Sequence, residues 1–209
     1  KNEILMLEQK ALQAMMNPHF VFNVMNSIQH YINTKNTASA NKILTGFARL
    51  IRKNLEMCTQ SYITLVEEID YLNLYLDLEK SRFGDKLQYA MNIGPHIDIE
   101  ETFIPSMWLQ PYIENAIWHG IMPKEEGGHL TINIWQQDEN YLLIEIIDNG
   151  IGIENSLHLK KDTYQSKGMG LTHNRIKLLN KIEAKAIQLN VQQNGKTGTK
   201  VSIRIPSSA

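Results

Sequence analysis

The chain has 209 residues, 43% of them hydrophobic, which is long enough for one large or two small globular domains with apolar cores. Its 21 basic and 22 acidic residues nearly cancel, which argues against nucleic-acid binding. The single cysteine, Cys58, excludes an intrachain disulfide framework and a cysteine-cluster metal site.

The apolar runs and the first residues of the chain indicate the cellular compartment. No stretch approaches the roughly 20 apolar residues that span a bilayer, and the first residues lack the layout of a signal peptide. The chain starts without methionine, within the helical spacing of Ile4, Leu7 and Ala11. We therefore expect a cytoplasmic fragment with further protein before Lys1.

The first part of the chain, to about residue 83, has helical periodicity. Helices are predicted over residues 4–30 and 36–58, and Pro18 is expected to bend the first one at His19, because it removes the amide bond to Ala14. Thr64 and Glu67 form a capping box that opens a third helix. The second helix carries an apolar stripe of Ile43, Leu44, Phe47, Leu50, Ile51 and Leu55.

The periodicity changes at Gly84, where the third helix is predicted to end. Strands are predicted over residues 87–93, 130–135, 141–147, 186–191 and 200–205, and helices from Pro105 to Ile121 and from Leu171 to Ile182. This order predicts an α+β protein in which helical residues 1–84 precede an α/β sandwich over residues 85–209.

Three short motifs in the second part indicate a nucleotide pocket only in combination. Asp148-Asn149-Gly150-Ile151-Gly152 follows an apolar strand, and Gly168-Met169-Gly170 precedes a helix whose free amides suit a phosphate. Glu114-Asn115 lies on a helix and offers oxygen ligands suited to magnesium. Taken singly, the Asp148 motif is a weak signal because it is also a common turn, and the other two are more typical of an ordinary loop and of a solvated helix face.

The motifs together resemble those of a known superfamily. Glu114-Asn115-Ala116, Asp148-x-Gly150-x-Gly152, Gly168-x-Gly170-Leu171 and Gly198-Thr199 are similar, in this order, to the boxes of the GHKL ATPases with the Bergerat fold. The upstream Pro18-His19-Phe20 segment, with Gln13, Phe22, Asn23, Asn26, Ser27 and Ile28, and the run from Gln110 to Gly120 more narrowly resemble LytS-type sensor histidine kinases.

The resemblance implies an ATP-dependent kinase that phosphorylates itself on His19, with Asn23 one turn later on the same helix. Asn115 would bind Mg²⁺, and Asp148 would bind the adenine amino group. His19, Asn23 and Glu114 are the implied catalytic residues. The implied ATP-binding residues are Asn115, His119, Asp148, Gly150, Gly152, Gly168, Gly170, Leu171 and Thr199.

Three positions depart from better-known histidine kinases. Phe20 follows His19 where many members have an acidic residue, so the proton acceptor is unassigned. Pro111 replaces a second asparagine, and Trp118 replaces a lysine that commonly contacts phosphate. Magnesium and phosphate are then expected to be held with help from Glu114 or His119.

The implied partners are a second copy of the chain and the receiver domain of a response regulator. The amphipathic helices at 4–30 and 36–58 form a hairpin that cannot bury both faces alone, so a four-helix bundle from two chains is expected. A sensor region before Lys1 would lie in the inner or plasma membrane. Two alternatives stay open: a nucleotide-binding regulatory module or pseudokinase, and a chaperone-type ATPase that uses Glu114 to activate water.

Overall fold

The computed structural model describes residues 18–153 and 187–206. It begins with a hairpin of two helices, α2 (Pro18–Asn33) and α3 (Thr37–Met57). The side chain of Asn36 caps α3 by accepting from the amide of Ser39 at 3.2 Å. Within the described residues, helix α2 extends three residues beyond the predicted end at residue 30, and the predicted bend involves Ala14, which lies outside them.

Helix α4 (Leu65–Phe83) confirms the predicted capping box. The amide of Thr64 donates to the Glu67 carboxylate at 2.8 Å, and the Thr64 hydroxyl accepts from the Glu67 amide. The helix ends as expected at Gly84, whose φ of 57° is costly for residues with a Cβ. A short 3-10 turn, η1 (Gly84–Lys86), leads into the sheet.

The main sheet has five strands in the order β2-β4-β5-β7-β6. Strands β2 and β4 are parallel, and the other pairs are antiparallel. Side chains of β5 and β7 alternate between buried and partly exposed positions, which explains why period-two patterning predicted them. The strands are β2 (Leu87–Ile93), β4 (Gly128–Asp138), β5 (Tyr141–Asp148), β6 (Gln188–Gln193) and β7 (Thr199–Pro206).

The segment before the site differs from its prediction. Pro105 does not start a helix: it ends β3 (Phe103–Pro105), which pairs with β1 (Tyr62–Thr64) in a separate two-stranded sheet. The chain then turns through Met107, whose φ is 58°. The helix begins only at α5 (Gln110–Asn115), with Pro111 in its first turn, and continues as the π-helix η2 (Ala116–Ile121).

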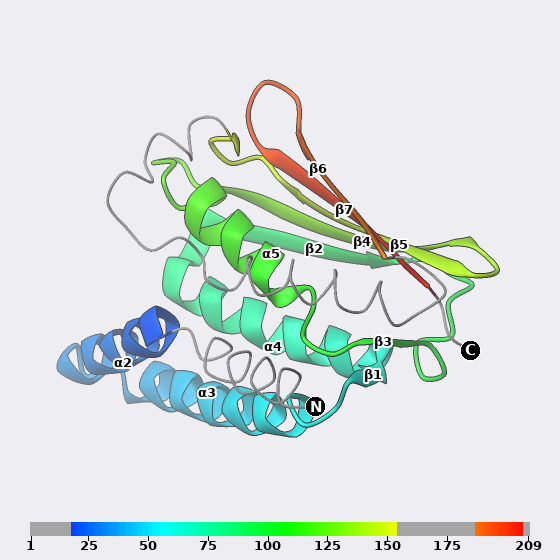
Figure 1. Cartoon of the computed structure of the whole chain (residues 1–209). Coiled ribbons are helices and arrows are strands. Elements are labelled where there is room, and N and C mark those ends of the chain that lie inside the picture. The colour runs from blue at the N-terminus through cyan, green and yellow to red at the C-terminus, as the bar shows by residue number, and fades with distance from the viewer. Residues whose placement is uncertain (1–17, 154–186, 207–209) are drawn as a thin grey trace, which may run out of the picture.

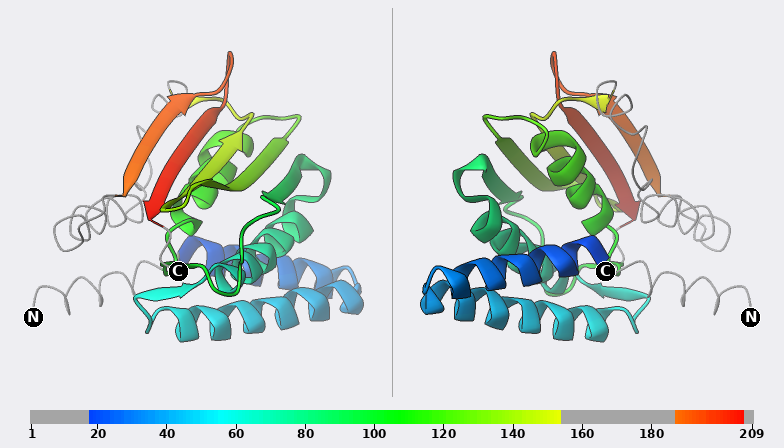
Figure 2. Two further views of the ribbon diagram at one scale, coloured as in Figure 1. Left: turned by 90° about the vertical axis from the view of Figure 1, so that its right-hand side faces the viewer. Right: turned by 90° about the vertical axis from the view of Figure 1, so that its left-hand side faces the viewer.

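The described elements form layers (Figures 1 and 2). Helices α4 and α5 lie on one face of the sheet, and the α2–α3 hairpin lies beyond α4. This arrangement confirms the predicted helical part followed by an α/β sandwich. The predicted helix from Leu171 to Ile182 lies outside the described residues.

Buried contacts connect the two predicted domains across Gly84. The carboxylate of Glu68, fully buried on α4, accepts from the amides of Met107 (3.3 Å) and Leu109 (3.4 Å), just before α5. The hydroxyl of Ser106 donates to the carbonyl of Met57 at 2.8 Å. The boundary at Gly84 stays a prediction, and these bonds hold the two parts together in this structure.

Candidate nucleotide and phosphoacceptor sites

Asp148 is the last residue of β5, and its side chain is only 3% exposed. Its Oδ1 accepts from the amides of Gly150 at 2.8 Å and Thr199 at 3.2 Å. Burial raises the pKa of this carboxyl, and the hydrogen bonds from Gly150 and Thr199 oppose that shift. The result is a carboxylate held in a fixed orientation at the end of a strand.

The loop after Asp148 is packed against the end of η2. The amide of Ile151 donates to the carbonyl of Gly120 at 2.9 Å. A Cβ on Gly150 would lie 2.2 Å from the backbone carbon of Gly120, and a Cβ on Gly120 would lie 2.9 Å from Oδ1 of Asp148. Glycine is therefore required sterically at both positions, because a side chain would separate the loop, η2 and the aspartate.

The start of β7 completes this corner. Thr199 pairs with Asp148 across the β5–β7 ladder, so these two implied ATP-binding residues lie side by side. Gly198 has a φ of 98°, and a Cβ there would lie 2.4 Å from the carbonyl oxygen of Asp148. Gly152, with a φ of 83°, lies near the amide of Gly198. Motifs about 50 residues apart thus meet around one carboxylate.

Asn115 ends α5, and its Oδ1 is buried with no hydrogen-bond partner among the described residues. A buried amide oxygen without a partner is costly, and a cation or a ligand donor would satisfy it. This atom therefore fits the magnesium ligand that the motif implies. Next to it, the carboxylate of Glu114 accepts from the side-chain amide of Gln110 at 2.8 Å. His119 is half-buried on η2.

Trp118 lies against α4. Its ring contacts Phe83 edge-on at 5.1 Å between centroids, and the guanidinium of Arg82 lies 5.1 Å from the Trp118 ring. Arg82 also bonds the fully buried carboxylate of Glu79 at 2.7 Å. Trp118, one of the three positions that depart from the better-known histidine kinases, is thus part of the packing between η2 and α4.

His19 is the second residue of α2, and Asn23 follows in the next turn, half-buried. The adjacent Phe20 is 6% exposed and packs on Tyr75 (5.2 Å between ring centroids) and Phe47 (6.1 Å). Phe20 therefore anchors the first turn of the helix in the core. The remaining predicted binding residues, Gly168, Gly170 and Leu171, lie outside the described residues.

The structure adds residues that the sequence did not single out. Lys124 donates to the carbonyl of Asn149 at 3.0 Å, and the Asn149 side chain accepts from the amide of His129 at 2.7 Å. Asn194 donates to the carbonyl of Asp148 at 3.1 Å. The Asp148-Asn149-Gly150 turn was recognisable in the sequence, but its hydrogen-bond partners come from separate segments, among them strand β4, and carry no local signal.

Comparisons with known families agree with this geometry. A family described as histidine kinase matches residues 7–87. A family described as histidine kinase-, DNA gyrase B- and HSP90-like ATPase matches residues 107–209. The second part of the chain is therefore an ATPase domain of the GHKL class, for which ATP binding is implied.

Curated relatives of the chain include named sensor histidine kinases. The chain is 33% identical over 206 residues to the sensor protein LytS of Oceanobacillus iheyensis, covering 95% of this chain and 34% of that protein. It is 34% identical over 176 residues to the sensor histidine kinase YpdA of Escherichia coli, covering 82% and 30%. The chain thus spans about a third of the length of the curated relatives it matches.

The fold is similar to that of a histidine kinase domain from the blue-light activated kinase EL346 of Erythrobacter litoralis, with a TM-score of 0.51 at 14% identity, covering 99% of this chain and 96% of that one. The chain belongs to the LytS-type sensor histidine kinases and corresponds to their kinase core. In the described part, no helix is both long and apolar enough to cross a membrane.

Proposed function

We propose that this chain catalyses ATP-dependent autophosphorylation of His19 and then passes the phosphoryl group to an aspartate of a response regulator. The main support is the corner around Asp148, where a buried, oriented carboxylate meets the glycines at 120, 150 and 198. Such a corner suits the exocyclic amino group and flat face of adenine. The family matches over both parts of the chain support the same function.

Asn115 is proposed to hold magnesium, because its Oδ1, which has no hydrogen-bond partner among the described residues, has the chemistry of a ligand for a hard cation. Bound Mg²⁺ would neutralise charge on the nucleotide phosphates. Gly152, Gly168, Gly170, Leu171 and Thr199 are proposed to shape the pocket and its cover. His119 and Glu114 are proposed to contribute on the phosphate side, since Trp118 is engaged with α4.

In the proposed reaction, an imidazole nitrogen of His19 attacks the γ-phosphorus in line, and the bond to the β–γ bridging oxygen breaks. ADP leaves, and the imidazole loses a proton. Asn23 lies on the same helix face and is proposed to hold the ring or a phosphoryl oxygen. Catalysis then consists mainly of positioning and charge neutralisation.

The hairpin is proposed to dimerise. Large apolar side chains are exposed on α2 and α3, with relative exposures from 44% to 68%, and helical spacing puts those of each helix on one face. A second copy would cover these stripes in a four-helix bundle. The stripes consist of Phe22, Met25 and Ile32 on α2 and Leu44 and Leu55 on α3.

The direct test is incubation with γ-labelled ATP and Mg²⁺, comparing the wild type with His19→Ala. Acid-labile, alkali-stable label that disappears in the variant is the expected result. Nucleotide binding should persist in His19→Ala, because Asp148 belongs to a different part of the chain. Loss of nucleotide binding in that variant would contradict this division.

A regulatory module that binds ATP without phosphorylating His19 is the second candidate. It is favoured by the packing of Trp118 against Arg82 and Phe83 and by the buried Phe20 beside His19. Under this alternative, a dimeric and intact chain binds ATP but acquires no label.

A further inference from the structure

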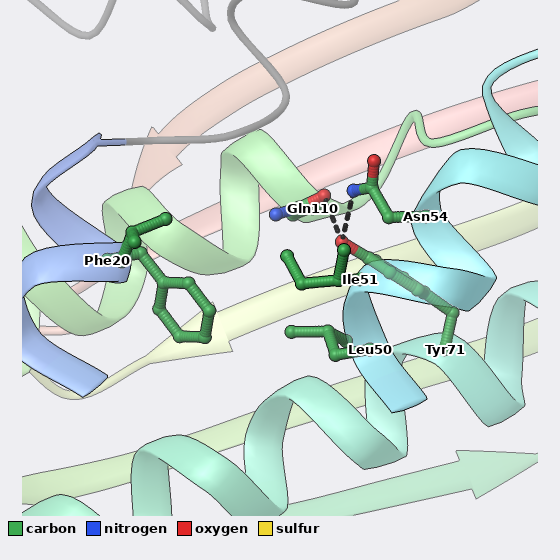
Figure 3. Close-up of a pocket in the computed structure, with 7 residues that line it drawn as sticks. Phe20, Leu50, Ile51, Asn54, Tyr71 and Gln110 are labelled. Atoms are coloured by element: carbon green, nitrogen blue, oxygen red, sulfur yellow. Dashed lines mark hydrogen bonds between the residues drawn. The ribbon is translucent and has the colours of Figure 1, made fainter. Parts of the chain in front are cut away.

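Four helices meet at a small cavity between the hairpin and the nucleotide domain (Figure 3). It is lined by Phe20 and Val21 of α2, by Asn54 of α3 together with Leu50 and Ile51, by Tyr71 of α4 and by Gln110 of α5. The first turn of α2, which contains His19, and the helix that leads to Asn115 therefore share one junction. The polar groups in this junction are buried, since Asn54, Tyr71 and Gln110 are 6%, 1% and 7% exposed.

These polar groups form one continuous hydrogen-bonded chain. The Asn54 amide donates to the Tyr71 hydroxyl at 3.1 Å, and that hydroxyl donates to Oε1 of Gln110 at 2.8 Å. The Gln110 amide in turn donates to Oε1 of Glu114 at 2.8 Å. These hydrogen bonds connect α3 through α4 to the carboxylate beside Asn115. Figure 3 shows the first two of them converging on the Tyr71 oxygen.

The carboxylate determines the direction of every bond. An ionised Glu114 only accepts hydrogen bonds, so Gln110 must present its NH₂ group to it and its carbonyl oxygen to Tyr71. Tyr71 must then donate its only proton to Gln110, which leaves its lone pairs for Asn54. Burial raises the pKa of the Tyr71 hydroxyl, so this donor keeps its proton near neutral pH.

We infer that Tyr71 and Gln110 are positioning residues for the phosphoryl transfer: they orient the Glu114 carboxylate and fix it relative to the junction that anchors the His19 turn. This inference rests on the proposed autophosphorylation. Tyr71 acts through Gln110, so its loss should change the rate of transfer more than the affinity for ATP.

The sharpest perturbation is Tyr71→Phe, which removes one hydroxyl and keeps the ring in the core. We expect the maximal autophosphorylation rate to fall at least about tenfold, with the KM for ATP within about twofold of wild type. Tyr75→Phe is the matched control, because Tyr75 is equally buried on the same helix but its hydroxyl donates to Glu79. An equal loss of rate in both variants would mean a general packing effect and would overturn the inference.

A double-mutant cycle separates positioning from stability. If Tyr71 acts through Glu114, Tyr71→Phe should have no further effect on the rate once Glu114→Gln has removed the carboxylate. Additive losses, or a wild-type rate in either single variant, would overturn this inference alone. An absence of label in the wild type itself would overturn the proposed function and, with it, the inference.

Discussion

Glu79 of α4 offers the most quantitative prediction, because burial shifts its pKa into the neutral range. Its side chain is fully buried and bonded to Arg82 and to the hydroxyl of Tyr75. Burial raises its pKa from the ordinary 4.5 to about 7, and the neighbouring charge of Glu114 adds to the shift. The Arg82 cation and the Tyr75 hydroxyl act in the opposite direction.

The folded protein therefore binds this proton more tightly than the unfolded chain does. Stability from this group is full below pH 4.5, declines as the pH rises, and is lost above about pH 7. Raising the pKa of Glu79 from 4.5 to about 7 on folding corresponds to about 3 kcal/mol in the free energy of unfolding. About 2.5 kcal/mol of this difference falls between pH 5 and pH 8.

Urea unfolding of the wild type and Glu79→Gln across this pH range measures the effect. We expect the wild type to lose about 2.5 kcal/mol relative to the variant between pH 5 and pH 8, because the glutamine has no proton to bind or release. In Glu114→Gln the shift should be smaller, since one of its causes is removed. A difference between wild type and Glu79→Gln that does not change with pH would refute the reasoning.

Three further predictions concern the nucleotide corner, the dimer and the third helix. Gly150→Ala should weaken ATP binding at least about tenfold in a calorimetric titration, because its Cβ would meet Gly120 at 2.2 Å, whereas Gly195→Ala, which strains a turn with a φ of 67° but meets nothing within 4 Å, should leave binding unchanged. Phe22→Glu should convert a dimer to a monomer in light scattering, since this residue is 68% exposed on the proposed interface; a dimer that persists would exclude α2 from it. Thr64→Ala should lower the free energy of unfolding by about 0.5–2 kcal/mol through loss of the cap, and an unchanged urea midpoint would contradict this.

Local signals in the sequence predicted most of the elements that the structure describes. The Thr64 capping box and Gly84 fixed the two ends of α4, because both act through contacts within one turn. Alternating apolar residues located both ends of β5 and β7 to within one residue. The motif around Asp148 could also be recognised in the sequence, because its strand, turn and glycines are contiguous.

Features that depend on distant partners were not predictable in this way. Pro105 is compatible with a helix start, and only its pairing with Tyr62, 43 positions earlier, makes it the end of a strand. The π-helical form of η2 is likewise associated with tertiary contacts, here those of Gly120 with Asp148 and Gly150. The hydrogen bonds that connect Asn54 to Glu114 join three helices, and the sequence of no single segment indicates them.

Helix α4 buries two glutamates, Glu68 and Glu79. Apolar side chains of the same volume at these positions would avoid the cost of desolvating the carboxylates, and such replacements are often at least as stable as buried ion pairs. An apolar face would not select particular partners. Glu68 accepts from two backbone amides just before α5, and the Tyr71 hydroxyl donates to the side-chain oxygen of Gln110 within α5. Sliding α5 along α4 would leave several buried groups without partners, each costing about 1–3 kcal/mol. The polar face therefore selects one placement of the segment that carries Asn115 relative to α4, and a fixed placement of this kind is what the proposed in-line transfer from bound ATP to His19 would require.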